Sequence, residues 1–128
     1  MKILLDTCTF LWICAGAPEL SRRAGQLFSD PANEVFLSSV SAWEISVKHA
    51  LGKLPLPRPP RVLVPEQRTL HGIERLALDE ESALLEATLP PLHTDPFDRM
   101  LICQALSQGL TLLTPDPQIA RYPVLVAW

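Results

Sequence analysis

The stretch Lys2-Ile3-Leu4-Leu5-Asp6-Thr7 decides the fold class of this chain. Its apolar residues follow one another without polar alternation, as is typical of a strand that helices cover on both faces of a parallel sheet. The run ends on a carboxylate, and open α/β folds bind their ligands at the carboxyl ends of the strands. Asp6 is therefore the first candidate for chemistry. It is also a good N-cap for a helix that would begin near Thr9.

Length and composition limit the possible classes of protein. A chain of 128 residues that is 48% hydrophobic fits one globular domain spanning residues 1–128. The net charge of -3 gives no basic patch of the kind that dedicated nucleic-acid binders carry, although an enzyme could still meet RNA through a few cations and a metal. Three cysteines without a C-x-x-C pair predict neither disulfides nor a zinc site. With no signal-peptide pattern and no apolar run of membrane-spanning length, we expect a cytoplasmic protein without membrane association.

Strands and helices alternate along the chain. Further strands are predicted at residues 34–38, 73–77, 110–114 and 124–126. Helices are predicted at residues 10–14, 19–29, 39–51, 66–71, 79–88 and from 96 to the stop signal Gly109. The proline-rich segment 54–65 is expected to be an extended connection. This order predicts an α/β fold with a central parallel sheet of about five strands.

Glu44 lies in the helix that directly follows the strand at 34–38, near the edge where Asp6 is expected. The apolar residues of this helix recur at helical spacing and are expected to be buried: Val40, Trp43, Val47 and Leu51. Two common surface features would also explain Glu44. Ser41-Ala-Trp-Glu44 matches a capping box, and Glu44 with Lys48 forms a favourable i,i+4 ion pair.

The segment around Asp95 and Asp98 is the most informative in the second half of the chain. Asp95 precedes Pro96 as an N-cap precedes a proline at the first helical position, so we interpret it as mainly structural. Asp98 shares a helix face with Leu101 and Ile102, and a carboxylate on a buried face is costly unless it is paired or binds a metal. Asp98 is thus the better functional candidate, although the helix dipole also favours an acid there.

Asp116 is the fourth acid that follows an apolar strand, after Asp6, Glu44 and Asp98, and a capping role would explain it as well. Four like charges cannot share one pocket fully ionised without a cation, because each raises the pKa of its neighbours. Ligand sets made only of oxygen favour Mg²⁺ or Mn²⁺ over zinc. Such a metal can activate water against a phosphodiester, and the four acids therefore predict a metal-dependent nuclease.

Four segments, in this order in so short a chain, resemble those of a PIN domain, and of a VapC-type toxin ribonuclease in particular. They are Leu4-Leu5-Asp6-Thr7, Ser41-Ala-Trp-Glu44-Ile, Asp95-Pro-Phe-Asp98-Arg-Met-Leu-Ile and Leu112-Leu-Thr-Pro-Asp116. The resemblance implies a three-layer α/β/α fold, Mg²⁺- or Mn²⁺-dependent cleavage of RNA, neutralisation by a small antitoxin and a homodimer. It also implies that Asp6, Glu44 and Asp98 form the acidic triad and that Asp116 is the more variable fourth acid.

Several other residues could assist these acids. Thr7 and Thr114 could hydrogen-bond the metal-binding carboxylates, and Asp95 could support them. Arg99 and Lys48 are candidate phosphate contacts, although a solvated charge is the usual role of such residues. The histidines share no spacing and are expected to be surface residues or hydrogen-bonded core residues, with only His93 near the acids.

Two other functions remain open at this point. A phosphatase-type domain could also place an Asp after its first strand, but Cys8 stands where haloacid-dehalogenase-like enzymes carry a second Asp. A PIN-like module that binds a partner without catalysis is the other alternative. The presence of all four acids argues against it.

Overall fold

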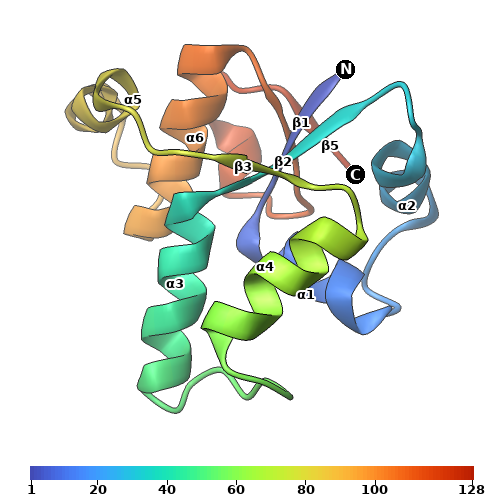
Figure 1. Ribbon diagram of the computed structural model, residues 1–128. Coiled ribbons are helices and arrows are strands. Elements are labelled where there is room, and N and C mark those ends of the chain that lie inside the picture. The colour runs from blue at the N-terminus through green and yellow to red at the C-terminus, as the bar shows by residue number, and fades with distance from the viewer.

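The computed structural model describes residues 1–128 and has a five-stranded parallel sheet at its centre, as predicted (Figure 1). The strands lie in the order β3-β2-β1-β4-β5, and every neighbouring pair is parallel. Their bounds are Lys2–Leu5 for β1, Glu34–Ser38 for β2, Glu74–Leu76 for β3, Thr111–Leu113 for β4 and Val126–Ala127 for β5. The predicted last strand, 124–126, lies about two residues too early.

Six α-helices and two short 3₁₀ helices connect the strands. Their bounds are Thr7–Ala15 for α1, Arg22–Ser29 for α2, Ser39–Ala50 for α3, Pro60–Leu70 for α4, Glu80–Leu85 for α5, Pro96–Gln108 for α6, Glu86–Thr88 for η1 and Ile119–Arg121 for η2. None of these helices is long and apolar enough to cross a membrane.

Alternate residues of β1 face two separate cores, which makes the fold three-layered. Ile3 and Leu5 pack with buried residues of α1, α2 and α4 on one face of the sheet. Leu4 packs with α6 on the other face. All three side chains are fully buried, which explains why the first strand shows no polar alternation in the sequence.

Helix ends follow the signals in the sequence. The side chains of Asp6, Asp79 and Asp95 cap α1, α5 and α6. Gly16 ends α1 with φ of 60° and Gly109 ends α6 with φ of 67°, in the left-handed region where a glycine is least strained. Because the first-strand acid is also the α1 cap, α1 begins at Thr7, three residues before the predicted start.

The proline-rich segment is only partly extended, so the prediction for residues 54–65 was wrong at its second half. Helix α4 begins at Pro60, where a proline fits the first helical position, and it continues through Pro65. Pro65 is exposed, while Leu63 and Val64 are buried. Burial of these two apolar side chains offsets the hydrogen bond that a proline removes from a helix interior.

The predicted buried stripe of α3 was right for Val40 and wrong for two of its other residues. The buried residues are Val40, Ser41, Glu44 and Ile45, while Trp43 is 61% exposed and Leu51 is 63% exposed. The N-cap is Ser38, so Ser41 does not begin a capping box. Burial of Ser41 and Glu44 is possible because both contact the Thr7 hydroxyl at the start of α1, and that contact turns this polar face inward.

Candidate active site

A small polar cavity of about 170 Å³ opens at the carboxyl ends of β1 and β4. Connections leave β1 and β4 toward opposite faces of the sheet, which is where open α/β folds bind ligands. All four acids predicted from the sequence line this cavity: Asp6, Glu44, Asp98 and Asp116. Cys8, Trp12, Lys48 and Asp95 are also part of its wall.

Asp6 caps α1 and also lines the cavity. Its Oδ1 accepts a hydrogen bond of 2.7 Å from the Thr9 backbone N–H and so caps α1. Its Oδ2 accepts a hydrogen bond of 2.5 Å from the hydroxyl of Thr114, just beyond β4. Burial raises the pKa of Asp6, and the hydrogen bonds from Thr114 and Thr9 partly oppose that rise. The carboxylate is therefore fixed in orientation by two neighbouring strand ends.

Glu44 is held from the opposite side of the cavity. The Thr7 hydroxyl donates to Glu44 Oε1 at 2.6 Å, and the Lys48 ammonium pairs with Oε2. The Glu44 side chain is only 7% exposed, whereas Lys48 is 41% exposed. The hydrogen bond to Glu44 raises the pKa of Lys48, which keeps a cation at the rim of the cavity. The ion pair expected from the i,i+4 spacing thus coexists with a place in the cavity wall.

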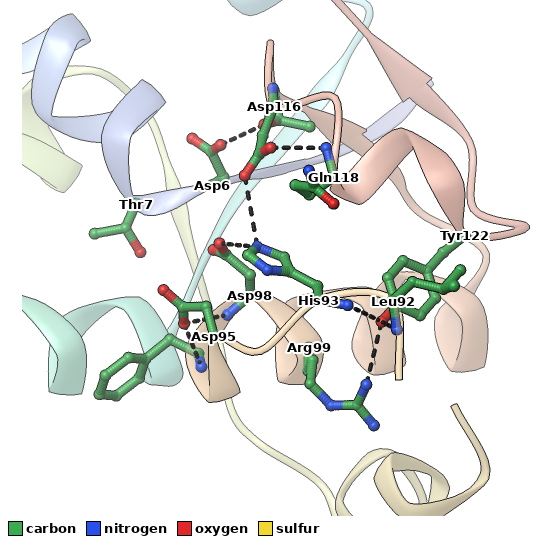
Figure 2. Close-up of polar contacts among 12 residues, drawn as sticks. Asp6, Thr7, Leu92, His93, Asp95, Asp98, Arg99, Asp116, Gln118 and Tyr122 are labelled. Carbon is green, nitrogen blue, oxygen red and sulfur yellow. Dashed lines mark hydrogen bonds and ion pairs between the residues drawn. The ribbon is translucent and has the colours of Figure 1, made fainter. Parts of the chain in front are cut away.

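Asp95 and Asp98 both line the cavity, and Asp95 is also the N-cap of α6, as predicted. Asp95 Oδ1 accepts hydrogen bonds from the backbone N–H groups of Phe97 at 2.8 Å and Asp98 at 3.1 Å, which caps α6. Asp98 points into the cavity (Figure 2). Burial raises the pKa of Asp98 to about 6, and the negative charge of Asp95 adds to the rise. A carboxyl in this state gains from any cation that enters the cavity.

His93 is the residue that the sequence interpretation undervalued. Its Nε2 lies 2.9 Å from Asp98 Oδ2 and 3.6 Å from Asp116 Oδ2, so the ring bridges the two acids (Figure 2). Asp116 is fixed by the Gln118 backbone N–H, which donates to its Oδ1 at 2.8 Å. The signal available in the sequence was that His93 stands two residues before the α6 cap, in the loop that enters the site.

The cavity fits a hard divalent cation by its donor set. The five acids of the wall offer carboxylate oxygens, and His93, which lies behind Asp98 and Asp116, offers a ring nitrogen. Side-chain atoms of His93, Asp98 and Asp116 all lie within 4.8 Å of one another, and they form the one group of this density in the chain. Carboxylate oxygens at such spacing are the ligands that Mg²⁺ and Mn²⁺ prefer.

Comparison with known proteins identifies the fold family. The family model of the PIN domain matches residues 3–125 of this chain. The chain belongs to the PIN domain family. A 53-residue stretch is 40% identical to Ribonuclease VapC16 of Mycobacterium tuberculosis, and it covers 41% of this chain and 38% of that protein.

Solved structures of VapBC complexes contain chains of similar fold. The chain is similar to a chain of VapBC2 from Rickettsia felis bound to a promoter DNA fragment, with a TM-score of 0.73 and 16% identity over 99% of this chain and 98% of that one. It is also similar to a chain of DNA-bound VapBC from Salmonella typhimurium, with a TM-score of 0.67 and 19% identity over 99% and 97% of the two chains.

Arg99, predicted as a candidate phosphate contact, does not line the cavity of this PIN domain. Its guanidinium bonds Glu86 Oε1 at 2.5 Å and the Tyr122 hydroxyl at 3.1 Å. The remaining donors bond three backbone carbonyls, those of Glu86, Leu89 and Pro90. These contacts account for the five N–H donors of an arginine, which leaves none for a phosphate. Glu86 is the charged partner of Arg99.

Gln104, for which the sequence analysis made no prediction, connects two walls of the PIN domain site. Gln104 of α6 is fully buried and lies 2.5 Å from the Ser38 hydroxyl, which caps α3. Its amide also donates to the Ala77 carbonyl at 3.1 Å. Gln104 therefore fixes the start of α3, which carries Glu44, against α6, which carries Asp98. A glutamine on an otherwise apolar helix face was the available signal.

Proposed function

We propose that this PIN domain is a divalent-metal-dependent endoribonuclease and the toxin of a toxin–antitoxin pair. The observation that carries the proposal is the convergence of Asp6, Glu44, Asp98 and Asp116 on one cavity at the carboxyl edge of the sheet. The local similarity to Ribonuclease VapC16 supports RNA as the substrate. The VapBC assemblies among its structural relatives support an antitoxin partner.

Each acid has a role in this proposal. Asp6, Glu44, Asp98 and Asp116 would hold Mg²⁺ or Mn²⁺, which when bound would activate water and offset the charge of the phosphodiester. Thr7 and Thr114 orient Glu44 and Asp6 by donating hydrogen bonds to them. A carboxylate fixed in this way needs little rearrangement when a cation or substrate arrives.

Lys48 is the cation best placed to meet the RNA backbone. Its ammonium lies at the cavity rim beside Glu44 and 5.8 Å from the centre of the Phe97 ring. If the Glu44 carboxylate binds a metal ion instead of the Lys48 ammonium, Lys48 becomes free to pair with a phosphate oxygen. The rest of the cavity wall is acidic, so the bound RNA would be contacted over a short length around the cleaved bond.

An apolar groove beside the cavity supports a protein partner. It has a volume of about 480 Å³ and lies between α1, the extended segment 54–58 and α4. Cys8 and Trp12 line both the groove and the acidic cavity, so the two are continuous. We infer that an antitoxin segment lays apolar side chains along the groove and places a basic side chain among the acids.

Incubation of the purified protein with RNA tests the activity. We expect cleavage in Mg²⁺ or Mn²⁺ and none when a chelator is present. Cleavage that persists in chelator would contradict the metal-dependent site. No cleavage under any metal condition would favour the non-catalytic PIN-like module.

A further inference from the structure

We propose that His93 is itself a metal ligand and that, with Asp98 and Asp116, it makes a nitrogen-containing cation position. Such a position favours Mn²⁺ or another first-row transition-metal ion over Mg²⁺. The assignment rests on the proposed function in one respect, which is that a divalent cation enters this cavity. It goes further by adding a ligand outside the four acids and by naming the class of ion.

The distances fit ligands that share one ion. His93 Nε2 lies 2.9 Å from Asp98 Oδ2 and 3.6 Å from Asp116 Oδ2. With metal–ligand bonds of about 2.1 Å, adjacent ligand atoms of an octahedral or tetrahedral ion are about 3.0–3.4 Å apart. The two nitrogen–oxygen distances differ from that range by only a few tenths of an ångström, and all three ligand atoms lie within 4.8 Å of one another.

The backbone of His93 is clamped so that its ring faces the acids. The Tyr122 hydroxyl accepts hydrogen bonds from the backbone N–H groups of His93 at 2.9 Å and Leu92 at 3.2 Å (Figure 2). The same hydroxyl donates to the Pro90 carbonyl at 2.8 Å and accepts from Arg99. His93, Asp98 and Asp116 are also largely shielded, with side chains 15%, 18% and 30% exposed. A ring held in this way can bind an ion at little entropic cost.

The two halves of the cavity differ in how far their carboxylates are already occupied. Asp6 accepts hydrogen bonds from Thr9 and Thr114. Glu44 accepts from Thr7 and Lys48. The Asp98 carboxylate has a single side-chain partner, which is His93. Asp98 is therefore the acid of the cavity with the most lone pairs left for an ion, while Asp116 accepts from the Gln118 backbone N–H at Oδ1 and keeps its Oδ2 toward His93.

The nitrogen donor decides which ions this position prefers. Imidazole is a ligand of transition metals, whereas Mg²⁺ takes oxygen ligands and retains several waters. Removal of the imidazole should therefore weaken Mn²⁺ binding far more than Mg²⁺ binding. The His93→Gln variant keeps a side chain that can hydrogen-bond Asp98 and removes the nitrogen ligand.

The experiment compares wild type, His93→Gln and the control His71→Gln, whose histidine packs edge-on against Phe28 away from the cavity. Calorimetry measures the dissociation constants of Mn²⁺ and Mg²⁺ for each protein. We expect His93→Gln to weaken Mn²⁺ binding about 10-fold or more and Mg²⁺ binding by less than about 3-fold. His71→Gln should match wild type for both ions.

Electron spin-echo spectroscopy of the Mn²⁺-loaded wild type supplies a readout that needs no variant. We expect modulation from a directly bound nitrogen, which changes when the histidines carry ¹⁵N. The assignment is overturned, even if RNA is cleaved, if Mn²⁺ binds without nitrogen modulation. It is also overturned if His93→Gln weakens the binding of Mn²⁺ and Mg²⁺ by the same factor. Nitrogen-bound Mn²⁺ in a protein that cleaves no RNA upholds it and refutes the proposed function instead. Failure of both ions to bind refutes both.

Discussion

The acidic cavity and the apolar groove share a wall, yet they are built from different parts of the molecule. The cavity of about 170 Å³ lies at strand ends, where hydrogen bonds from Thr7, Thr9 and Thr114 fix the acids. The groove of about 480 Å³ lies between helices and the proline-rich segment, and most of its lining is hydrophobic. In the proposed function, the cavity supplies the chemistry, which needs fixed carboxylates, and the groove binds the partner, which needs apolar area.

Cys8 and Trp12 line both regions, so an occupant of one can reach the other. A partner bound along the groove needs only one extended side chain to reach Asp6 or Glu44. Inhibition and substrate binding would then compete for the same carboxylates, without any change of fold. The predictions below separate the two regions, beginning with the largest expected effect.

Neutralising a cavity acid should have the largest effect. Asp6→Asn and Asp98→Asn are nearly isosteric but remove a negative ligand, so we expect RNA cleavage in Mn²⁺ to fall about 100-fold or more. Asp30→Asn is the matched control, because Asp30 is exposed at the end of α2. Initial rates of cleavage measure the effect. Wild-type rates in both cavity variants would show that the acids serve only as caps.

The second prediction concerns the groove. Ala15 is an exposed groove residue at the last position of α1, so Ala15→Arg places a long charged side chain across the groove. We expect the affinity for the antitoxin to fall about 10-fold or more, because a charge would be buried against apolar surface. Ala50→Arg, at the exposed last position of α3, should bind as wild type does. Titration calorimetry with the antitoxin measures both.

Much of this comparison could be predicted from the sequence because it depends on local signals. The buried run Ile3-Leu4-Leu5 predicted the central parallel strand, and the acid after it fell at the sheet edge. Asp95 followed by Pro96 predicted the start of α6 to the residue. In each case the determining contacts lie within a few residues along the chain, where helix caps and hydrophobic patterns act.

The features that the sequence missed depend on contacts between distant residues. His93 acquires its place because Tyr122, 29 residues later, holds its backbone. The sequence gives no sign that Arg99 is hydrogen-bonded, because its acceptors Glu86 and Pro90 reach it only in the folded chain. Trp43 fits a buried stripe by spacing alone, but Thr7 draws the neighbouring polar face of α3 inward. Such choices are made by tertiary packing and not by local preference.

The third prediction contrasts the two basic residues once grouped as RNA contacts. Arg99→Gln leaves several backbone carbonyls and the partly exposed Glu86 without donors, so we expect a loss of about 1–3 kcal/mol of stability. Lys48→Gln removes a half-exposed cation, so we expect less than about 1 kcal/mol of destabilisation but a weaker affinity for RNA. Chemical denaturation measures the stability difference. Equal stability of the two variants would contradict the structural role of Arg99.

The last prediction is that neutralising Asp98 stabilises the metal-free protein, by an amount that depends on pH. The pKa of Asp98 is about 6 in the folded chain, above its ordinary value of 3.8. The folded state therefore binds the proton more tightly than the unfolded state. The stabilising contribution of this group is fully present below the ordinary pKa and is lost as the pH rises through about 6.

Asp98→Asn removes this loss because an amide does not ionise. In metal-free buffer near pH 7.5 we expect the variant to be more stable than wild type by on the order of 1–2 kcal/mol, and the advantage should shrink toward pH 4.5. Saturating Mn²⁺ should reverse the order of stability, since wild type gains about 2.7 kcal/mol at free metal 100 times the dissociation constant and the variant loses a ligand.

Glu81→Gln on the exposed side of α5 controls for the general effect of removing one negative charge. Thermal melts of the three proteins decide between two explanations of Asp98. A metal site predicts opposite shifts in chelator and in Mn²⁺, whereas a residue that only favours the helix dipole predicts the same small loss in both.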